Sequence, residues 1–232
     1  MQQETRNGKQ ETGNFKTKSF KFQVSSFKLR QGFGLIEFMI VITVFGIATA
    51  VITASFLTFE RNQRLKSAAS MLKNDIRLIQ NKALGGDKST PNCSKVTDPA
   101  PVLVGWYLNV VKGSSEYTLN SDCRNKDSIE DPDILIKIVS LPRGVKISDV
   151  QYGNSSPVSK DAINVLFQPL THNTSFHDAL LAITPPFLDN SGNLKDLLGS
   201  LPQEMLSIIL AGDQGGTYKV IVQPSGEVNE QK

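Results

Sequence analysis

The acidic residue with the most unusual surroundings is Glu37, which stands at the start of a long apolar run. No charged residue occurs from Phe38 to Phe59, a stretch of 22 residues. A carboxylate that enters a membrane with such a run costs roughly 2.5 kcal/mol or more, so it usually has a partner of opposite charge. The alternative is a hydrated carboxylate at the level of the lipid headgroups. Glu37 is therefore a candidate for ion-pair chemistry.

The two cysteines, Cys93 and Cys123, are the next candidates. Both lie in polar sequence that we expect to form loops, on opposite sides of the first two expected strands. In an oxidising compartment they could form a disulfide that stabilises the fold by a few kcal/mol. They could equally be two unrelated free thiols, because sequence does not fix the distance between them. Two cysteines alone make a poor metal site.

The two histidines, His172 and His177, lie close together in the sequence Thr-His-Asn-Thr-Ser-Phe-His-Asp. A site built from both histidines and Asp178 is conceivable. A spacing of five residues in a loop is not a recognised ligand motif, however, so we expect two solvated loop histidines.

A calcium site is the other metal hypothesis, because residues 189–193 (Asp-Asn-Ser-Gly-Asn) offer alternating oxygen atoms. Leu194 and Ser200 stand where an EF-hand loop needs glycine and glutamate, which excludes that loop and favours a plain turn. We find no nucleophile elbow and no paired catalytic carboxylates in a recognisable context. The sequence therefore predicts a protein that is not an enzyme, with no cofactor and no metal.

The charge of the chain is unevenly distributed. Residues 1–32 contain seven basic and two acidic residues, a net charge of +5, within a total of +3. Without this segment 18 basic and 20 acidic residues remain, a net charge of −2. A nucleic-acid-binding protein would need a basic face, so we expect no nucleic-acid partner.

The apolar run is long enough to cross a membrane. As a helix, 22 residues span roughly 33 Å, against a bilayer core of about 30 Å. The basic segment before it predicts that the N-terminus stays in the cytoplasm and that the rest is exported. A secretory signal cleaved at Ala48-Thr49-Ala50 fits less well, because apolar residues continue past that site.

The helix is expected to continue beyond the membrane as an amphipathic segment. Six apolar residues recur at spacings of three or four and form one stripe: Leu65, Ala69, Leu72, Ile76, Ile79 and Ala83. Gly85-Gly86 would end the helix. We therefore expect one helix over residues 33–84, with its first half in lipid and its second half packed on a domain.

The remaining sequence predicts an α+β fold in which a C-terminal antiparallel β-sheet domain packs on this helix. After a loop at 87–101, apolar and β-branched segments separated by turn residues indicate a meander of short strands. These strands are expected at 102–111, 116–120, 133–140, 145–150, 162–167, 206–211 and 217–223, with a last short edge after Pro224-Ser225-Gly226.

The segment Gly32-Phe33-Gly34-Leu35-Ile36-Glu37, with its basic leader and apolar helix, resembles the class III signal of type IV prepilins and type II secretion pseudopilins. This resemblance implies that a prepilin peptidase cuts between Gly32 and Phe33 and methylates the new amine of Phe33. It also implies that Glu37 neutralises the amine of a neighbouring subunit during assembly. Gly34 departs from the family, in which threonine or serine is more usual.

Five further segments, in the same order, are similar to the minor H-type pseudopilins and related minor pilins. They are Arg64-Leu65-Lys66-Ser67-Ala68, Gly105-Trp106-Tyr107, Tyr117-Thr118-Leu119, Leu141-Pro142-Arg143-Gly144-Val145 and Val220-Ile221-Val222-Gln223-Pro224-Ser225-Gly226. Residues 171–203 depart from this pattern and are expected to be an insertion, with a short helix at 194–198. The absence of a helix-kinking proline, which major pilins often carry, also favours a pseudopilin or minor pilin.

Together these features predict a structural minor pilin or pseudopilin with four parts: a cleaved cytoplasmic leader (1–32), a transmembrane and assembly helix (33–59), its amphipathic continuation (60–86) and an exported β-rich domain (87–232). The resemblance implies storage in the inner membrane and then a periplasmic or extracellular filament. The expected partners are prepilin peptidase, other pilin subunits, the inner-membrane assembly platform and lipid. The alternatives are an uncleaved signal-anchored binding module and a DNA-uptake minor pilin.

Overall fold

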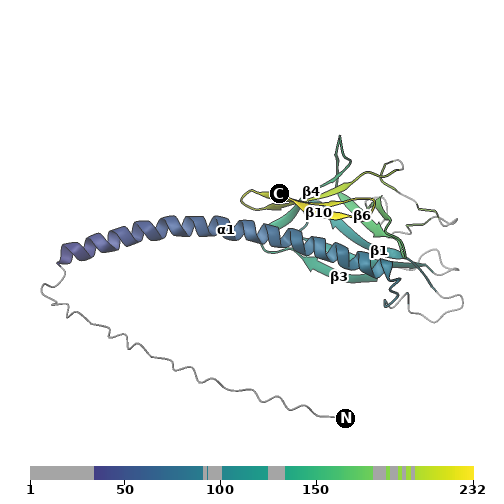
Figure 1. The fold of residues 1–232 in the computed structure, drawn as a ribbon, viewed down its shortest axis with the longest axis horizontal. Coiled ribbons are helices and arrows are strands. Elements are labelled where there is room, and N and C mark those ends of the chain that lie inside the picture. Colours follow the sequence, from purple (N-terminus) through teal and green to yellow (C-terminus); the bar gives the residue numbers. More distant parts are fainter. Residues whose placement is uncertain are drawn as a thin grey trace, which may run out of the picture. The chain divides into compact units, whose positions relative to one another are not determined.

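The computed structural model describes residues 34–90, 93, 101–124, 134–179, 187–188, 193–194, 197–199 and 202–232. The one helix among these described residues, α1 (Leu35–Leu84), has 50 residues and no proline, and Figure 1 shows it as one continuous ribbon. Its bounds confirm the predicted helix, although Phe33, the expected first residue, lies outside the described residues. Ala50–Lys232 forms one compact unit that contains the second part of α1 and all the strands.

Helix α1 ends in a Schellman motif. Gly86 adopts a φ of 60°, a left-handed conformation that glycine accepts without strain. Its backbone N–H donates to the carbonyl of Ala83, and the N–H of Asp87 donates to the carbonyl of Lys82, both at 2.9 Å. These two bonds satisfy carbonyl groups that the last turn leaves without partners. The paired glycines therefore end the helix where the sequence predicted.

Within the described residues, ten strands form two antiparallel sheets of five strands each. The first sheet has the order β3-β2-β1-β6-β7, and the second has the order β10-β9-β8-β4-β5. The strands of the first sheet are β1 (Val102–Val111), β2 (Glu116–Arg124), β3 (Ile134–Ser140), β6 (Ala162–Phe167) and β7 (Thr174–Asp178). Those of the second are β4 (Val145–Tyr152), β5 (Val158–Lys160), β8 (Leu206–Gly212), β9 (Thr217–Val222) and β10 (Val228–Gln231).

The expected meander is only partly right, because the chain passes from one sheet to the other and back. Strands β1, β2 and β3 follow one another as neighbours, but the turn at Pro142–Gly144 then leads into the second sheet. Gly144 has a φ of 80° in this turn. The chain later returns to the first sheet, where β6 pairs with β1. Local strand patterns show where strands occur but not which distant strands pair.

Two strands that the sequence did not predict, β5 and β7, lie at sheet edges. Strand β5 has only three residues, too few for a periodic pattern. Strand β7 is Thr-Ser-Phe-His-Asp, in which Phe176 is the only strongly apolar residue. It lies inside the expected insertion at 171–203, so part of that segment belongs to the first sheet. The short helix expected at 194–198 is wrong for its described residues, because Leu194 and Leu197 form isolated β-bridges instead.

The apolar stripe of α1 forms the centre of the core. All six of its predicted residues, from Leu65 to Ala83, are at most 4% exposed. They belong to one cluster with buried residues of both sheets, among them Trp106 and Tyr117 from the first sheet and Ile208 and Val220 from the second. Figure 1 shows strands lying along the part of α1 that carries this stripe. Burial of this face therefore holds helix and sheets together.

Polar side chains on the same part of α1 bind each sheet separately. The Tyr117 hydroxyl on β2 donates to the Asp75 carboxylate at 2.7 Å. On the other side, Ser70 donates to Glu230 on β10 at 3.1 Å, and Gln80 donates to the carbonyl of Gly226 at 3.0 Å. Burial of Tyr117, together with its bond to Asp75, raises the pKa of its hydroxyl above the ordinary value.

Candidate functional site

The first turn of α1 fixes the position of the Glu37 carboxylate. The backbone N–H of Gly34 donates to Glu37 Oε2 at 3.1 Å, and the N–H of Glu37 donates to the carbonyl of Gly34 at 2.9 Å. Gly34 is thus the N-cap and Glu37 the third helical residue, the position from which a glutamate closes a capping box. Because the donor is a backbone N–H, this bond does not depend on the hydroxyl that Gly34 lacks relative to the threonine or serine usual in the family. Gly32 and Phe33, the predicted cleavage and methylation residues, lie outside the described residues.

The helix beyond Glu37 presents apolar side chains on all its faces. Fifteen large apolar side chains between Leu35 and Phe59 have exposed fractions of 43–78%. Burying one such side chain contributes roughly 1.5–3 kcal/mol, so this surface requires an apolar environment. Within the described residues, α1 is the one helix whose length and composition would allow it to cross a membrane. Lipid or other apolar helices are the environments that match it.

Threonine side chains in this segment are compatible with an apolar environment. The hydroxyl of Thr43 donates to the carbonyl of Met39 at 2.6 Å, and that of Thr49 donates to the carbonyl of Phe45 at 2.7 Å. Each hydroxyl is therefore satisfied inside its own helix and needs no water. These two threonines do not counteract insertion of this segment into lipid.

The long helix packed on two antiparallel sheets is a pilin-like α+β architecture. Residues 27–53 match a family model described as the prokaryotic N-terminal methylation motif. This segment therefore carries a class III prepilin signal, which supports a pilin-type or pseudopilin-type subunit and implies processing by prepilin peptidase and assembly with other pilins. The motif and the apolar helix together indicate a membrane anchor. Neither the curated proteins nor the solved structures include a match to this chain.

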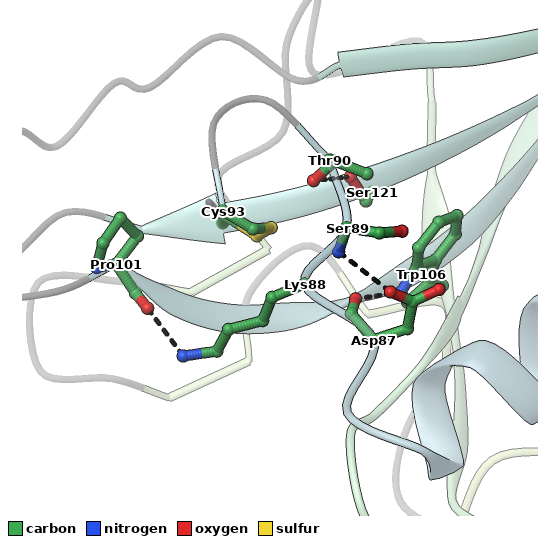
Figure 2. Close-up of a disulfide and its surroundings, with 9 residues drawn as sticks. Asp87, Lys88, Ser89, Thr90, Cys93, Pro101, Trp106 and Ser121 are labelled. Atoms are coloured by element: carbon green, nitrogen blue, oxygen red, sulfur yellow. Dashed lines mark hydrogen bonds between the residues drawn. A yellow bond between two sulfur atoms is a disulfide. The ribbon is translucent and has the colours of Figure 1, made fainter. Parts of the chain in front are cut away.

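The other end of α1 is held by a cluster around Lys82. Its ammonium forms an ion pair with Asp87 at 2.6 Å and lies 4.5 Å from the centre of the Trp106 ring. The Trp106 indole N–H donates to the carbonyl of Asp87 at 3.0 Å, as Figure 2 shows. The hydrogen bonds from Lys82 and Ser89 lower the pKa of the Asp87 carboxyl from 3.8 to about 2. This cluster joins the end of the helix to β1.

Cys93 and Cys123 form a disulfide, with their Cα atoms 5.5 Å apart. Both residues are 5% exposed. We expected Cys123 to lie in a loop, but it lies in β2. The polar residues Asn120, Ser121 and Asp122 are buried in the sheet and extend this strand beyond its predicted end. Beside the disulfide, the hydroxyls of Thr90 and Ser121 are hydrogen-bonded at 3.1 Å (Figure 2).

The expectation of two solvated loop histidines is wrong for His177. This residue lies on β7 and is 2% exposed. Its Nε2 is 2.8 Å from the Ser175 hydroxyl, and its ring packs edge-on against Phe187 at 4.8 Å between centroids. His172, by contrast, is exposed. An imidazole enclosed in this way has a packing role. Asp178, the third residue of the conceivable site, forms an ion pair with Lys160 at 3.3 Å.

No group of three histidine, cysteine, aspartate or glutamate residues that could hold a metal occurs within the part of the chain that the structure describes. The oxygen-rich run at 189–193 lies outside the described residues, apart from Asn193. The cluster around Lys82 was not predicted from the sequence. The features that could have indicated it are a lysine in the last helical turn and an aspartate directly after Gly85-Gly86, and both are common at helix ends.

Proposed function

We propose that this chain is a minor pseudopilin or minor pilin, a structural subunit of a type II secretion pseudopilus or a type IV pilus. Prepilin peptidase removes residues 1–32, and the new amine of Phe33 is methylated. The observation that carries the proposal is the exposed apolar surface between Leu35 and Phe59, on a helix whose second part lies in the core of a folded domain. Such a helix connects a filament core to a surface domain.

The mechanism follows from the two environments available to this surface. Before assembly, lipid covers the apolar residues and the basic leader keeps the N-terminus in the cytoplasm. In the filament, helices of other subunits replace the lipid, and packing between them supplies the attraction. Glu37 then pairs with the Phe33 amine of a neighbour. Because this pair forms only at one axial offset, Glu37 sets the register of assembly.

A minor rather than a major subunit is favoured by two features. Helix α1 contains no proline from Leu35 to Leu84, and major pilins often carry a kinking proline there. The order of segments along the β domain is similar to that of the H-type subunits. Residues 171–203 depart from this order, and their described part adds strand β7 and the buried residues Phe187 and Leu198 to the domain.

The proposal is tested by co-expressing the full chain with a prepilin peptidase and determining its intact mass and N-terminal sequence. We expect a chain that begins at Phe33 and carries one added methyl group. A Gly32→Ala variant, which replaces the glycine before the cut, should keep its leader from Met1 and migrate more slowly on a gel than the processed wild type. A wild-type chain that remains uncut would overturn the proposal and leave a signal-anchored binding module.

A further inference from the structure

Three arginines from two distant parts of the chain line one hollow. Arg61 and Arg64 lie on α1, and Arg143 lies in the turn between β3 and β4. The hollow has a volume of about 190 Å³, and its lining also includes residues 212–215, at the end of β8 and in the turn that leads to β9. Gly212 and Gly215 have no side chains to fill it. The sequence placed these arginines in unrelated segments, and only the fold brings them together.

The charges around the hollow do not cancel. Arg64 forms an ion pair with Glu60 on the preceding turn of the helix. Among the described residues, Arg61 and Arg143 form no ion pair, and both are exposed. Asp213 is the one further charged residue in the lining. With Glu60 and Arg64 balanced, two arginines face one aspartate, and the site keeps a net charge of +1.

The hollow lies at a defined distance from the apolar segment. Phe59 is the last residue of the uncharged run. At about 1.5 Å per residue, Arg61 is roughly 3 Å and Arg64 roughly 7.5 Å further along the helix axis. The polar layer of each leaflet is about 5–7 Å thick outside the hydrocarbon core. When the apolar segment spans the bilayer, these arginines reach the depth of the lipid phosphates.

We propose that this hollow binds the phosphodiester of a membrane phospholipid headgroup while the subunit is stored in the membrane. The inference rests on the membrane storage in the proposed function. Guanidinium groups present paired N–H donors that match phosphate oxygens, and Arg61 and Arg143 supply them from two different elements of the fold. A phosphodiester carries one negative charge, which balances the net charge of the site. The domain is thereby tied to the membrane surface, and assembly must release the lipid.

The full chain in neutral detergent is titrated with short-chain phosphatidylglycerol, and the bound lipid is measured by native mass spectrometry. One lipid should bind saturably, and the double variant Arg61→Gln/Arg143→Gln should bind it roughly tenfold more weakly or worse. The matched control is Arg77→Gln, an exposed arginine on the same helix outside the hollow, which should bind as the wild type does. Asp213→Asn removes the opposing charge and should bind more tightly.

Three results would overturn the inference. Equal lipid binding by the wild type and the double variant would show that the arginines do not hold the phosphate. Inorganic phosphate that binds as tightly as the lipid would make the ligand a free anion. The double variant could also bind lipid normally but fail to enter filaments. That result would indicate that the arginines pair with a carboxylate of a neighbouring subunit.

Membrane insertion is measured separately, by carbonate extraction of the wild-type chain from cell membranes. Extraction of the wild type would contradict the proposed function itself. Retention of the wild type in the membrane, combined with absent lipid binding, would contradict only the present inference. Circular dichroism of each variant confirms that the exposed substitutions leave the fold intact.

Discussion

The backbone N–H of Gly34 donates a hydrogen bond to the Glu37 carboxylate, at 3.1 Å. In the single subunit, therefore, the carboxylate caps its own helix, one residue from the Phe33 amine that cleavage would free. A carboxylate has several acceptor positions, so it can keep this bond and still pair with an amine from a neighbour. The observed capping role and the proposed assembly role of this side chain are therefore separable.

Substitutions at Glu37 distinguish these two roles. Glutamine can close a capping box as glutamate does, but it carries no charge. We expect Glu37→Gln to be cleaved, inserted and stable as the wild type is, yet to enter filaments at least roughly tenfold less, since an uncompensated amine costs about 2.5 kcal/mol. The fraction of subunit in sheared filaments measures this.

Glu37→Ala loses both the cap and the charge, and Glu37→Asp keeps the charge on a shorter side chain. If Glu37→Gln enters filaments normally while Glu37→Ala does not, capping is the function and the register hypothesis is wrong. Partial recovery by Glu37→Asp would support a charge pair that depends on reach.

The same substitution at two isoleucines of α1 should have opposite consequences. Ile76 is fully buried in the domain core, whereas Ile52 is 69% exposed. We expect Ile76→Ala to lower the free energy of unfolding by about 2–5 kcal/mol, because it leaves a cavity. Ile52→Ala should change it by less than about 0.5 kcal/mol. Urea unfolding of the full chain in detergent, followed by the fluorescence of the buried Trp106, measures both.

Filament incorporation should show the reverse order, with Ile52→Ala reduced and the folded fraction of Ile76→Ala incorporated normally. Equal destabilisation by the two substitutions would mean that the exposed part of α1 belongs to the domain fold, contrary to its exposed surface.

The helix was predictable from sequence because its signals are local and repeated. The stripe from Leu65 to Ala83 recurs over five turns, and Gly86 provides the left-handed residue that the end of the helix requires. Strands with strong β propensity, such as Val102–Val111 and Ala162–Phe167, were likewise predicted with their observed bounds. In these segments local preference and tertiary packing agree.

The features that sequence did not reveal depend on contacts between distant residues. Strand β7 is polar in sequence and becomes buried only through its pairing with β6. His177 is enclosed because Phe187, ten residues away, packs against it. Arg61 and Arg143 line one hollow only because the chain turns after β3 into the second sheet. The apolar segment and Glu37, by contrast, were recognisable from residue type and spacing alone.

The ion pair between Lys82 and Asp87 should make stability depend on pH in the acidic range. The folded state lowers the pKa of Asp87 from 3.8 to about 2, so the stabilisation is complete above about pH 4 and is lost as the pH falls towards 2. The pair is partly exposed, so we expect Asp87→Asn to cost only about 1 kcal/mol at neutral pH. The difference in unfolding free energy from the wild type should shrink between pH 4 and pH 2.

The control is Lys82→Met, which keeps an alkyl chain over Trp106 but removes the charge. It should raise the pKa of Asp87 towards its ordinary value and shift the acid transition upwards. Asp149, whose burial is outweighed by hydrogen bonds from Ser159, Lys112 and Gln151, also has a pKa of about 2 and titrates in the same range. The test therefore compares the free energy of unfolding of the variant with that of the wild type at each pH, rather than using either pH curve alone. A difference that stays constant from pH 4 to pH 2 would contradict the pair.

Reduction of the disulfide between Cys93 and Cys123 should destabilise the domain. The bond closes a loop with a sequence separation of 30 residues, for which the loss of chain entropy in the unfolded state predicts about 3–4 kcal/mol. We expect the urea midpoint of the wild-type chain to fall on addition of a thiol reductant. The Cys93→Ser/Cys123→Ser variant should have the lower midpoint both with and without the reductant.

Labelling of free thiols in the unfolded chain, before and after reduction, reports whether the bond was present at the start. A wild-type midpoint that does not respond to complete reduction would show that the buried β2 residues and the Thr90–Ser121 bond hold this region without the covalent link.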